Sequence, residues 1–103
     1  MVAFKADLVK PGKVRLTWSE ENPGSLESIQ IQRSGDGIHF QVIGVCRQPV
    51  NFNYTYMDET AVVGPFYYRL QLRQNSGEIT CSEVCKLLTP FFRAPACQLF
   101  LLF

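Results

Sequence analysis

Hydrophobic side chains recur at every second position in short runs along most of this chain, and this period restricts the fold more than any other feature. The runs cover residues 2–8, 14–18, 29–31, 40–45, 52–56, 66–72 and 79–87. A period of two places successive side chains on opposite faces of a strand, whereas a helix needs a period of 3.6 residues, which no window sustains. Seven short strands at this spacing predict an all-β protein in which two antiparallel sheets pack as a β-sandwich.

Turn-forming residues separate the runs. Residues 34–37 (Ser-Gly-Asp-Gly) and 74–77 (Gln-Asn-Ser-Gly) contain glycines that supply the positive φ of tight hairpins. Residues 20–25, which include Asn-Pro-Gly, predict a loop, and residues 58–65 predict a crossover between the two sheets. The alternation changes parity at Ile43, which indicates a β-bulge.

Length and composition set the class of protein. A chain of 103 residues has the size of one domain, and folding buries roughly 65% of the surface of a chain of this length. Apolar residues make up 47% of the sequence and charged residues 18%, which is typical of a globular protein. The net charge of +1 argues against a nucleic-acid partner, because such a small binder would need a dominant basic face.

The two ends of the chain differ. The opening residues alternate like a strand and do not have the basic start and apolar run of a signal peptide. Residues 1–88 carry the strand pattern, and residues 89–103 form an apolar tail in which Pro90, Arg93 and Pro95 argue against a membrane span. The tail could begin a following domain, pack on the sandwich over an edge strand, or mediate self-association.

Five segments carry motifs of one kind: residues 14–19 (Val-Arg-Leu-Thr-Trp-Ser), 29–34 (Ile-Gln-Ile-Gln-Arg-Ser), 35–40, 54–58 (Tyr-Thr-Tyr-Met-Asp) and 67–70 (Tyr-Tyr-Arg-Leu). Together these segments resemble the fibronectin type III-like modules found near the C-terminus of secreted bacterial multidomain proteins. The resemblance implies a seven-stranded immunoglobulin-like sandwich that is secreted or displayed on the cell surface. It also implies a non-catalytic role in spacing, presentation or weak adhesion, with neighbouring domains of a parent chain as partners.

The same resemblance assigns structural roles to five residues. Trp18 is expected to fill the core between the sheets, where its large area dominates the packing energy. Ile31, Phe40 and Leu70 are expected to face the same core. Tyr68 is the candidate for a tyrosine that anchors the crossover through its hydroxyl group.

Two uncertainties of register accompany these roles. The register also allows Phe66 to take the anchoring position, and in that case no hydroxyl would be present. Arg33 and Arg69 lie on neighbouring strands of the expected sheet, where they could stack or pair at the surface.

Catalysis is not expected. Ser34, Asp36 and His39 lie within one hairpin, so their spacing does not produce the geometry of a catalytic triad, and His39 should point to solvent. The adjacent acids at 20–21 and 58–59 should diverge in extended structure, unlike the facing carboxyls of a glycosidase. Asp58 fits better as a turn acceptor for backbone amides. We therefore expect no enzyme activity, no cofactor and no metal site.

The four cysteines do not form a C-x-x-C pair, which argues against zinc-ribbon and thioredoxin-like sites. Cys81 and Cys85 would lie about 13 Å apart on one regular strand, too far for a disulfide. The expected strand order separates Cys46 from both of them. Pairing of Cys85 with Cys97 remains open if the tail folds back, and four free thiols are the other alternative.

A second functional hypothesis is a carbohydrate- or protein-binding module. Aromatic residues cluster near residues 52–56 and 66–68, and exposed rings can stack on sugars. The candidate surface residues are Tyr54, Tyr67 and Asn75, together with the loops at 22–25 and 74–77. Core packing would produce the same pattern, since alternation buries about half of these side chains.

Overall fold

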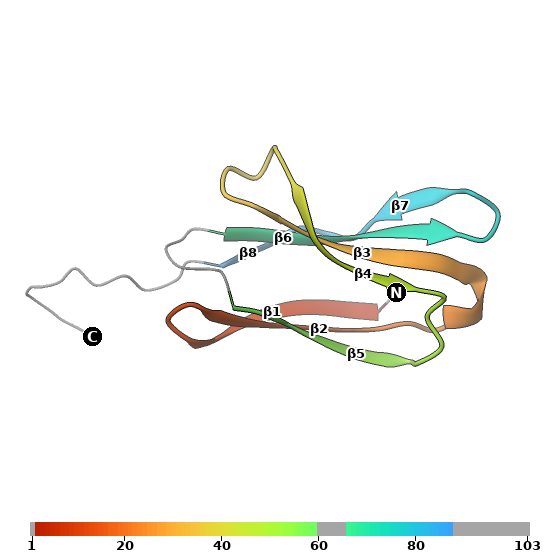
Figure 1. The fold of residues 1–103 in the computed structure, drawn as a ribbon, viewed down its shortest axis with the longest axis horizontal. Coiled ribbons are helices and arrows are strands. Elements are labelled where there is room, and N and C mark those ends of the chain that lie inside the picture. Colours follow the sequence, from red (N-terminus) through yellow and green to blue (C-terminus); the bar gives the residue numbers. More distant parts are fainter. Residues whose placement is uncertain (1, 60–65, 88–103) are drawn as a thin grey trace, which may run out of the picture.

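The computed structural model describes residues 2–59 and 66–87. These residues form eight strands and one short 3-10 turn (Figure 1), which are β1 (Val2–Lys10), β2 (Lys13–Ser19), η1 (Pro23–Ser25), β3 (Leu26–Ser34), β4 (Gln41–Arg47), β5 (Asn53–Asp58), β6 (Phe66–Gln74), β7 (Ile79–Cys81) and β8 (Cys85–Leu87). The prediction of an all-β chain is confirmed. The predicted run at 79–87 is divided between β7 and β8. The expected tail, residues 89–103, lies outside the described residues.

The strands form two antiparallel sheets. One sheet has the order β1-β2-β5, and the other has the order β4-β3-β6-β7, with β8 also paired to β6. Figure 1 shows the two sheets as facing layers, with the β3–β6 pair lying over β2. The predicted bulge is present in the β3–β4 pair, because Ile31 aligns with Gly44 and Gln32 with Val42, so that Ile43 is the additional residue.

The core lies between the sheets and comes from the alternating positions of three strands. Its buried members are Val14, Leu16 and Trp18 of β2, Leu26, Ile29 and Ile31 of β3, and Tyr68, Leu70 and Leu72 of β6. The ring of Trp18 stacks on Tyr54 of β5, with centroids 5.3 Å apart and planes 9° apart, and meets Phe4 of β1 edge-on. Four of the five residues expected inside, Trp18, Ile31, Tyr68 and Leu70, belong to this cluster.

Phe40 is the exception. It is half-buried and precedes β4, so it does not take part in the alternation of a paired strand. The guanidinium carbon of Arg69 lies 4.1 Å from the centre of its ring. Arg69 alternates along β6 with the buried Tyr68 and Leu70, so this contact lies on the outer face of the sheet. The aromatic ring therefore covers a polar surface and does not fill the core.

Arg33 and Arg69, which the sequence allowed to stack or pair at the surface, do not meet, because the two residues lie on opposite faces of their sheet. In the β3–β6 register, Arg33 aligns with Tyr68 and Arg69 aligns with Gln32. A one-residue offset in register turns a side chain to the other face. Arg33 consequently reaches Asp58 at the end of the sandwich, while Arg69 donates from Nε to Gln32 Oε1 at 2.7 Å.

A buried polar cluster closes the end of the sandwich at the start of the crossover. The hydroxyl of Tyr68 donates to Asp58 Oδ2 at 2.8 Å. Arg33 donates from Nη1 to both oxygens of the same carboxylate, at 2.9 and 2.7 Å. Asp58 is the last residue of β5 and is only 4% exposed. It therefore receives side-chain donors from the opposite sheet, in addition to any role as a turn acceptor, and ties β5 to β3 and β6.

Candidate functional site

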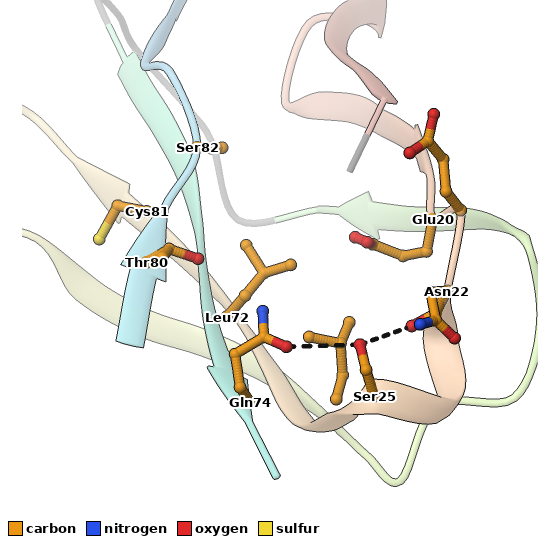
Figure 2. A pocket seen from close by; sticks show the side chains of 10 residues that line it. Glu20, Asn22, Ser25, Leu72, Gln74, Thr80, Cys81 and Ser82 are labelled. Atoms are coloured by element: carbon orange, nitrogen blue, oxygen red, sulfur yellow. Dashed lines mark hydrogen bonds between the residues drawn. The ribbon is translucent and has the colours of Figure 1, made fainter. Parts of the chain in front are cut away.

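A pocket of about 250 Å³ opens between the connection that follows β2 and the β6–β7 side of the second sheet. Figure 2 shows its lining, which consists of Glu20, Glu21, Asn22, Ser25, Leu26, Leu72, Gln74, Thr80, Cys81 and Ser82. The two loops that the sequence suggested for binding both contribute to this lining, residues 22–25 through Asn22 and Ser25 and residues 74–77 through Gln74. The pocket is therefore the candidate binding site of the described chain.

Hydrogen bonds hold the two loops together on one side of the pocket. The backbone amide of Asn75 donates to Ser25 O, and its side-chain Nδ2 donates to Gly24 O, both at 2.9 Å. Ser25 Oγ lies 2.8 Å from Asn22 O and 3.3 Å from Gln74 Oε1, as the dashed lines in Figure 2 show. Asn75 thus holds the loop at residues 22–25 in position, but it is not part of the pocket lining.

The opposite wall is the short strand β7 and the residue that follows it. Ser82 continues the hydrogen bonding of β7 to β6, with its side chain in place of one backbone group. Its amide donates to Leu70 O, and its Oγ accepts from Leu70 N, both at 2.8 Å. Thr80 and Cys81 are exposed on this wall. The edge of the pocket is therefore fixed to the central strand β6 by backbone contacts.

Glu20 brings a carboxylate into the pocket. Its residue is 4% exposed, and burial raises the pKa of the Glu20 carboxyl above its usual value. Its backbone amide donates to Phe52 O at 2.8 Å, which fixes the start of the connection after β2. The neighbouring Glu21 is exposed. The two acids diverge as predicted, but only one of them reaches solvent freely.

The sequence contained a signal for Glu20 that the prediction did not use. Val14, Leu16 and Trp18 face the core, and Glu20 continues their parity one step beyond β2. Alternation alone therefore places this carboxylate on the inner side. Thr80 and Ser82 carried no comparable signal, because their place in the wall depends on the pairing of β7 with β6.

The three residues proposed for a binding surface do not come together. Tyr54 faces inward and stacks on Trp18, where burial raises the pKa of its hydroxyl group. Tyr67 alternates with the buried Tyr68 on β6, and its ring lies 5.6 Å from Lys86 Nζ. Asn75 follows the far end of the same strand. Tyr67 and Asn75 are eight residues apart along β6 and its turn, a separation of about 25 Å.

In the hairpin that contains His39, three side chains are joined by hydrogen bonds, and the carboxylate of Asp36 lies between Ser34 and His39. Ser34 Oγ donates to Asp36 Oδ1, and His39 Nδ1 lies 2.8 Å from Asp36 Oδ2. The His39 side chain is 86% exposed. Hydrogen bonds from the side chain and backbone of His39, then from the Ile38 amide and Ser34, lower the pKa of Asp36 well below its usual range. A triad would instead place the histidine between serine and carboxylate.

The cysteines in the described part of the chain are all free. Cys46 and Cys85 are half-buried and Cys81 is exposed. Cys85 Sγ donates to Phe4 O at 3.3 Å, and burial raises the pKa of its thiol. The fourth cysteine, Cys97, lies outside the described residues, and so does any pairing with it.

A polar network on the outer face of the second sheet was not anticipated. Gln32, which is 6% exposed, donates to Gln30 Oε1 at 2.9 Å and to Gln71 Oε1 at 2.8 Å. It also accepts from Arg69, whose guanidinium group covers Phe40. Alternate glutamines on β3 and one on β6 were visible in the sequence, but their contact required the strand register. The network joins side chains across two strands and is a structural feature of this face.

Within residues 2–59 and 66–87, no group of three or more histidine, cysteine or acidic side chains could hold a metal ion. The same residues include no helix long and apolar enough to cross a membrane. Comparison with protein-family models, with curated proteins and with solved structures found no match to this chain.

Proposed function

We propose that this chain is a non-catalytic sandwich module of the fibronectin type III-like kind, which spaces or presents neighbouring domains of a larger secreted or cell-surface protein. The observation that carries the proposal is the placement of the two ends of the described chain. Val2 pairs with Ser19 at one end of β2. Asp58 pairs with Val14 at the other end of β2 and accepts a hydrogen bond from Tyr68. Leu87 pairs with Phe66, which lies beside Tyr68 at this same end of the sandwich.

The described residues therefore begin with β1 and end with β8 at opposite ends of the long direction of the sandwich (Figure 1). The Val14 and Ser19 levels of β2 are five residues apart, which corresponds to about 17 Å, and the nine-residue strands β3 and β6 reach about 26 Å. Copies joined in sequence would extend end to end. The strand orders β1-β2-β5 and β4-β3-β6-β7 further support the fibronectin type III-like assignment.

Small-angle X-ray scattering of two full chains joined in tandem tests the spacing role. The maximum dimension of the pair should exceed that of the single full chain by about 25 Å or more, because each module adds at least its strand length. The single chain serves as the reference. A pair whose maximum dimension hardly grows would mean that the modules fold back on each other, and the spacing role would be rejected.

A second function, ligand or partner binding, is favoured by one observation. The loops at 22–25 and 74–77 form one wall of a pocket, and hydrogen bonds from Asn75 to Ser25 O and Gly24 O hold that wall in place. A pocket with fixed walls loses little entropy when a ligand enters. Tyr67 lies outside this lining. Binding to a protein or glycan that is lost on Tyr67→Ala, with the fold intact, would indicate a different surface from the pocket.

A further inference from the structure

The outer face of the second sheet carries positive charges and no negative ones at its paired positions. The strand register places Arg47 and Arg73 on either side of Ser28, about 10 Å apart across β3. Arg69 and Lys86 lie further along the same face. None of the paired positions that face outward on this sheet is Asp or Glu. The face should therefore attract an anionic partner.

No acidic side chain of the protein neutralises the two exposed arginines of this face, Arg47 and Arg73. All nine acidic residues of the sequence lie within the described ranges, so the segments outside them bring no carboxylate side chain. Glu27, at the irregularity of β3, and Glu78, which precedes β7, adjoin the paired positions. Neither forms an ion pair with either arginine in the described structure. Both guanidinium groups are therefore open to carboxylates of a partner.

Strand β4 borders this face and is the end strand of its sheet. Within the part of the chain that the structure describes, its outer edge pairs with no strand. β4 contains no lysine or proline, residues that commonly protect an exposed edge. The bulge at Ile43 protects one half of the strand, and its carbonyl already accepts from the Tyr56 hydroxyl at 2.8 Å. Residues 44–47 keep a regular register with β3 and offer a regular edge for another strand.

The side chains along this edge indicate what an added strand would carry. Val42 and Val45 face outward and are 45% and 46% exposed, and Arg47 follows on the same face. In an antiparallel partner, the residue opposite Arg47 comes first, and the residue opposite Val45 follows two positions later. Opposite charges and apolar pairs stabilise cross-strand neighbours. The complementary strand therefore has an acidic residue followed, two positions later, by an apolar β-branched one.

A polypeptide is the class of polyanion that fits both features. Sulfated sugars and nucleic acids would satisfy the positive charge, but they have no row of backbone amide and carbonyl groups that could extend a sheet. An extended peptide adds to a sheet edge through main-chain hydrogen bonds and gains specificity from its alternate side chains. The open edge thus selects among anionic partners that the charge alone would attract equally.

We propose that β4 binds an acidic, extended segment of a partner polypeptide, which adds to the sheet as an antiparallel strand. Its backbone pairs with residues 44–47, a carboxylate contacts Arg47, and an apolar side chain covers Val45. Arg73 and Arg69 attract the segment through the field of the face, which salt screens. The inference deepens the second proposed function, partner binding, and places it on β4 and not at the pocket.

Titration of the ¹⁵N-labelled full chain with synthetic peptides tests this inference. The probe is acetyl-Glu-Asp-Glu-Thr-Val-Thr-Val-Thr-amide, whose odd positions carry the acidic and apolar side chains on one face. We expect saturable amide shifts and slower hydrogen exchange in residues 41–47, with a dissociation constant on the order of 1 mM. Binding should weaken in about 0.5 M salt. A peptide with lysine in place of its three acids should produce neither effect.

Backbone methylation separates strand addition from attraction by charge. Two forms of the acidic peptide carry N-methyl groups on the odd or on the even backbone amides. Successive amides of a strand point to opposite sides, so only one of the two forms loses the hydrogen bonds to β4. We expect one form to bind and the other to fail, although both have the same charge and side chains.

A matched pair of variants locates the charge that matters. Arg47→Gln should weaken binding of the acidic peptide about two- to fivefold, as expected for an exposed ion pair. Arg15→Gln is the control, because it removes the same charge from an exposed arginine on the first sheet, where Arg15 pairs with Asp7 and Met57. The control should bind the peptide as the natural protein does.

Each outcome decides the inference. Equal binding of both methylated peptides would overturn strand addition, and equal weakening by Arg47→Gln and Arg15→Gln would overturn the placement on β4. Tighter binding of a heparin hexasaccharide than of the peptide would overturn the polypeptide class. Shifts confined to residues 20–25 and 80–82 would overturn the β4 site while leaving partner binding at the pocket. The absence of saturable shifts with the acidic peptide up to about 10 mM would also overturn the proposal.

Discussion

Removing one oxygen atom from the core tests the buried cluster at the crossover end. Tyr68 is 0% exposed and donates from its hydroxyl to Asp58 Oδ2 at 2.8 Å. A hydrogen bond to a charged group contributes about 1.5–3 kcal/mol. In Tyr68→Phe, Asp58 keeps its contacts with Arg33, so the loss should stay within this range. We expect the free energy of unfolding to fall by about 2 kcal/mol.

Urea unfolding of the full chain measures this change through the fluorescence of Trp18, the single tryptophan, which lies in the core. The midpoint should decrease while the slope with urea stays constant, because the surface exposed on unfolding is unchanged. For a domain of this size, a loss of about 2 kcal/mol corresponds to a decrease in melting temperature of roughly 8–16 °C.

Tyr67→Phe is the matched control, since it removes the same atom from the neighbouring residue on the outer face of β6. Tyr67 is half-buried, and its variant should change the unfolding free energy by less than about 0.5 kcal/mol. Equal stability of the two variants would refute the assignment of Tyr68 as the residue that anchors the crossover.

The pH dependence provides a second test of the same contact. Burial, followed by the hydrogen bond and negative charge of Asp58, raises the pKa of Tyr68 well above its usual value. The folded state therefore holds this proton more tightly than the unfolded state, whose tyrosine titrates at about pH 10. The stabilisation is complete below that pH and declines above it. The stability difference between the natural protein and Tyr68→Phe should narrow as pH rises past about 10, and a constant difference would contradict the reasoning.

Three further predictions concern other parts of the molecule. Gly44→Ala should lower the unfolding free energy by about 1–3 kcal/mol in the same urea assay, because its Cβ would lie 2.8 Å from the ring of Tyr56, whereas Gly24→Ala meets no atom within 4 Å and should be nearly neutral. In Asp36→Asn, the free energy of unfolding should fall less steeply between about pH 4 and pH 2 in acid titrations than it does in the natural protein. The folded state holds the pKa of the Asp36 carboxyl low, so the natural protein loses this stabilisation as pH falls, whereas the variant has none to lose. Among the three described cysteines, exposed Cys81 should react first with iodoacetamide in peptide mapping by mass spectrometry, and faster alkylation of half-buried Cys85, whose thiol pKa is raised, would contradict the described fold.

The local pattern predicted the strands and most of the core because both depend on neighbours in sequence. Alternation in Val14, Leu16 and Trp18 identifies the buried face of β2 without knowledge of its partners. The positive φ of Gly37 and Gly77 follows from the hairpins that the sequence predicted at their positions. Phe40 departs from this pattern because it precedes β4, and alternation places a side chain reliably only within a paired strand.

Contacts between distant strands were decided only by the tertiary structure. Whether Arg33 met Arg69 or Asp58 depended on a one-residue offset in the β3–β6 register, and a period of two cannot fix that offset. The pocket depends on the same kind of information, since Glu20 and Thr80 come from segments sixty residues apart. The sequence alone therefore determined which side chains face inward along each strand. Only strand pairing determined which of them meet, because pairing energy depends on the complementarity of whole faces and not on the pattern of any one segment.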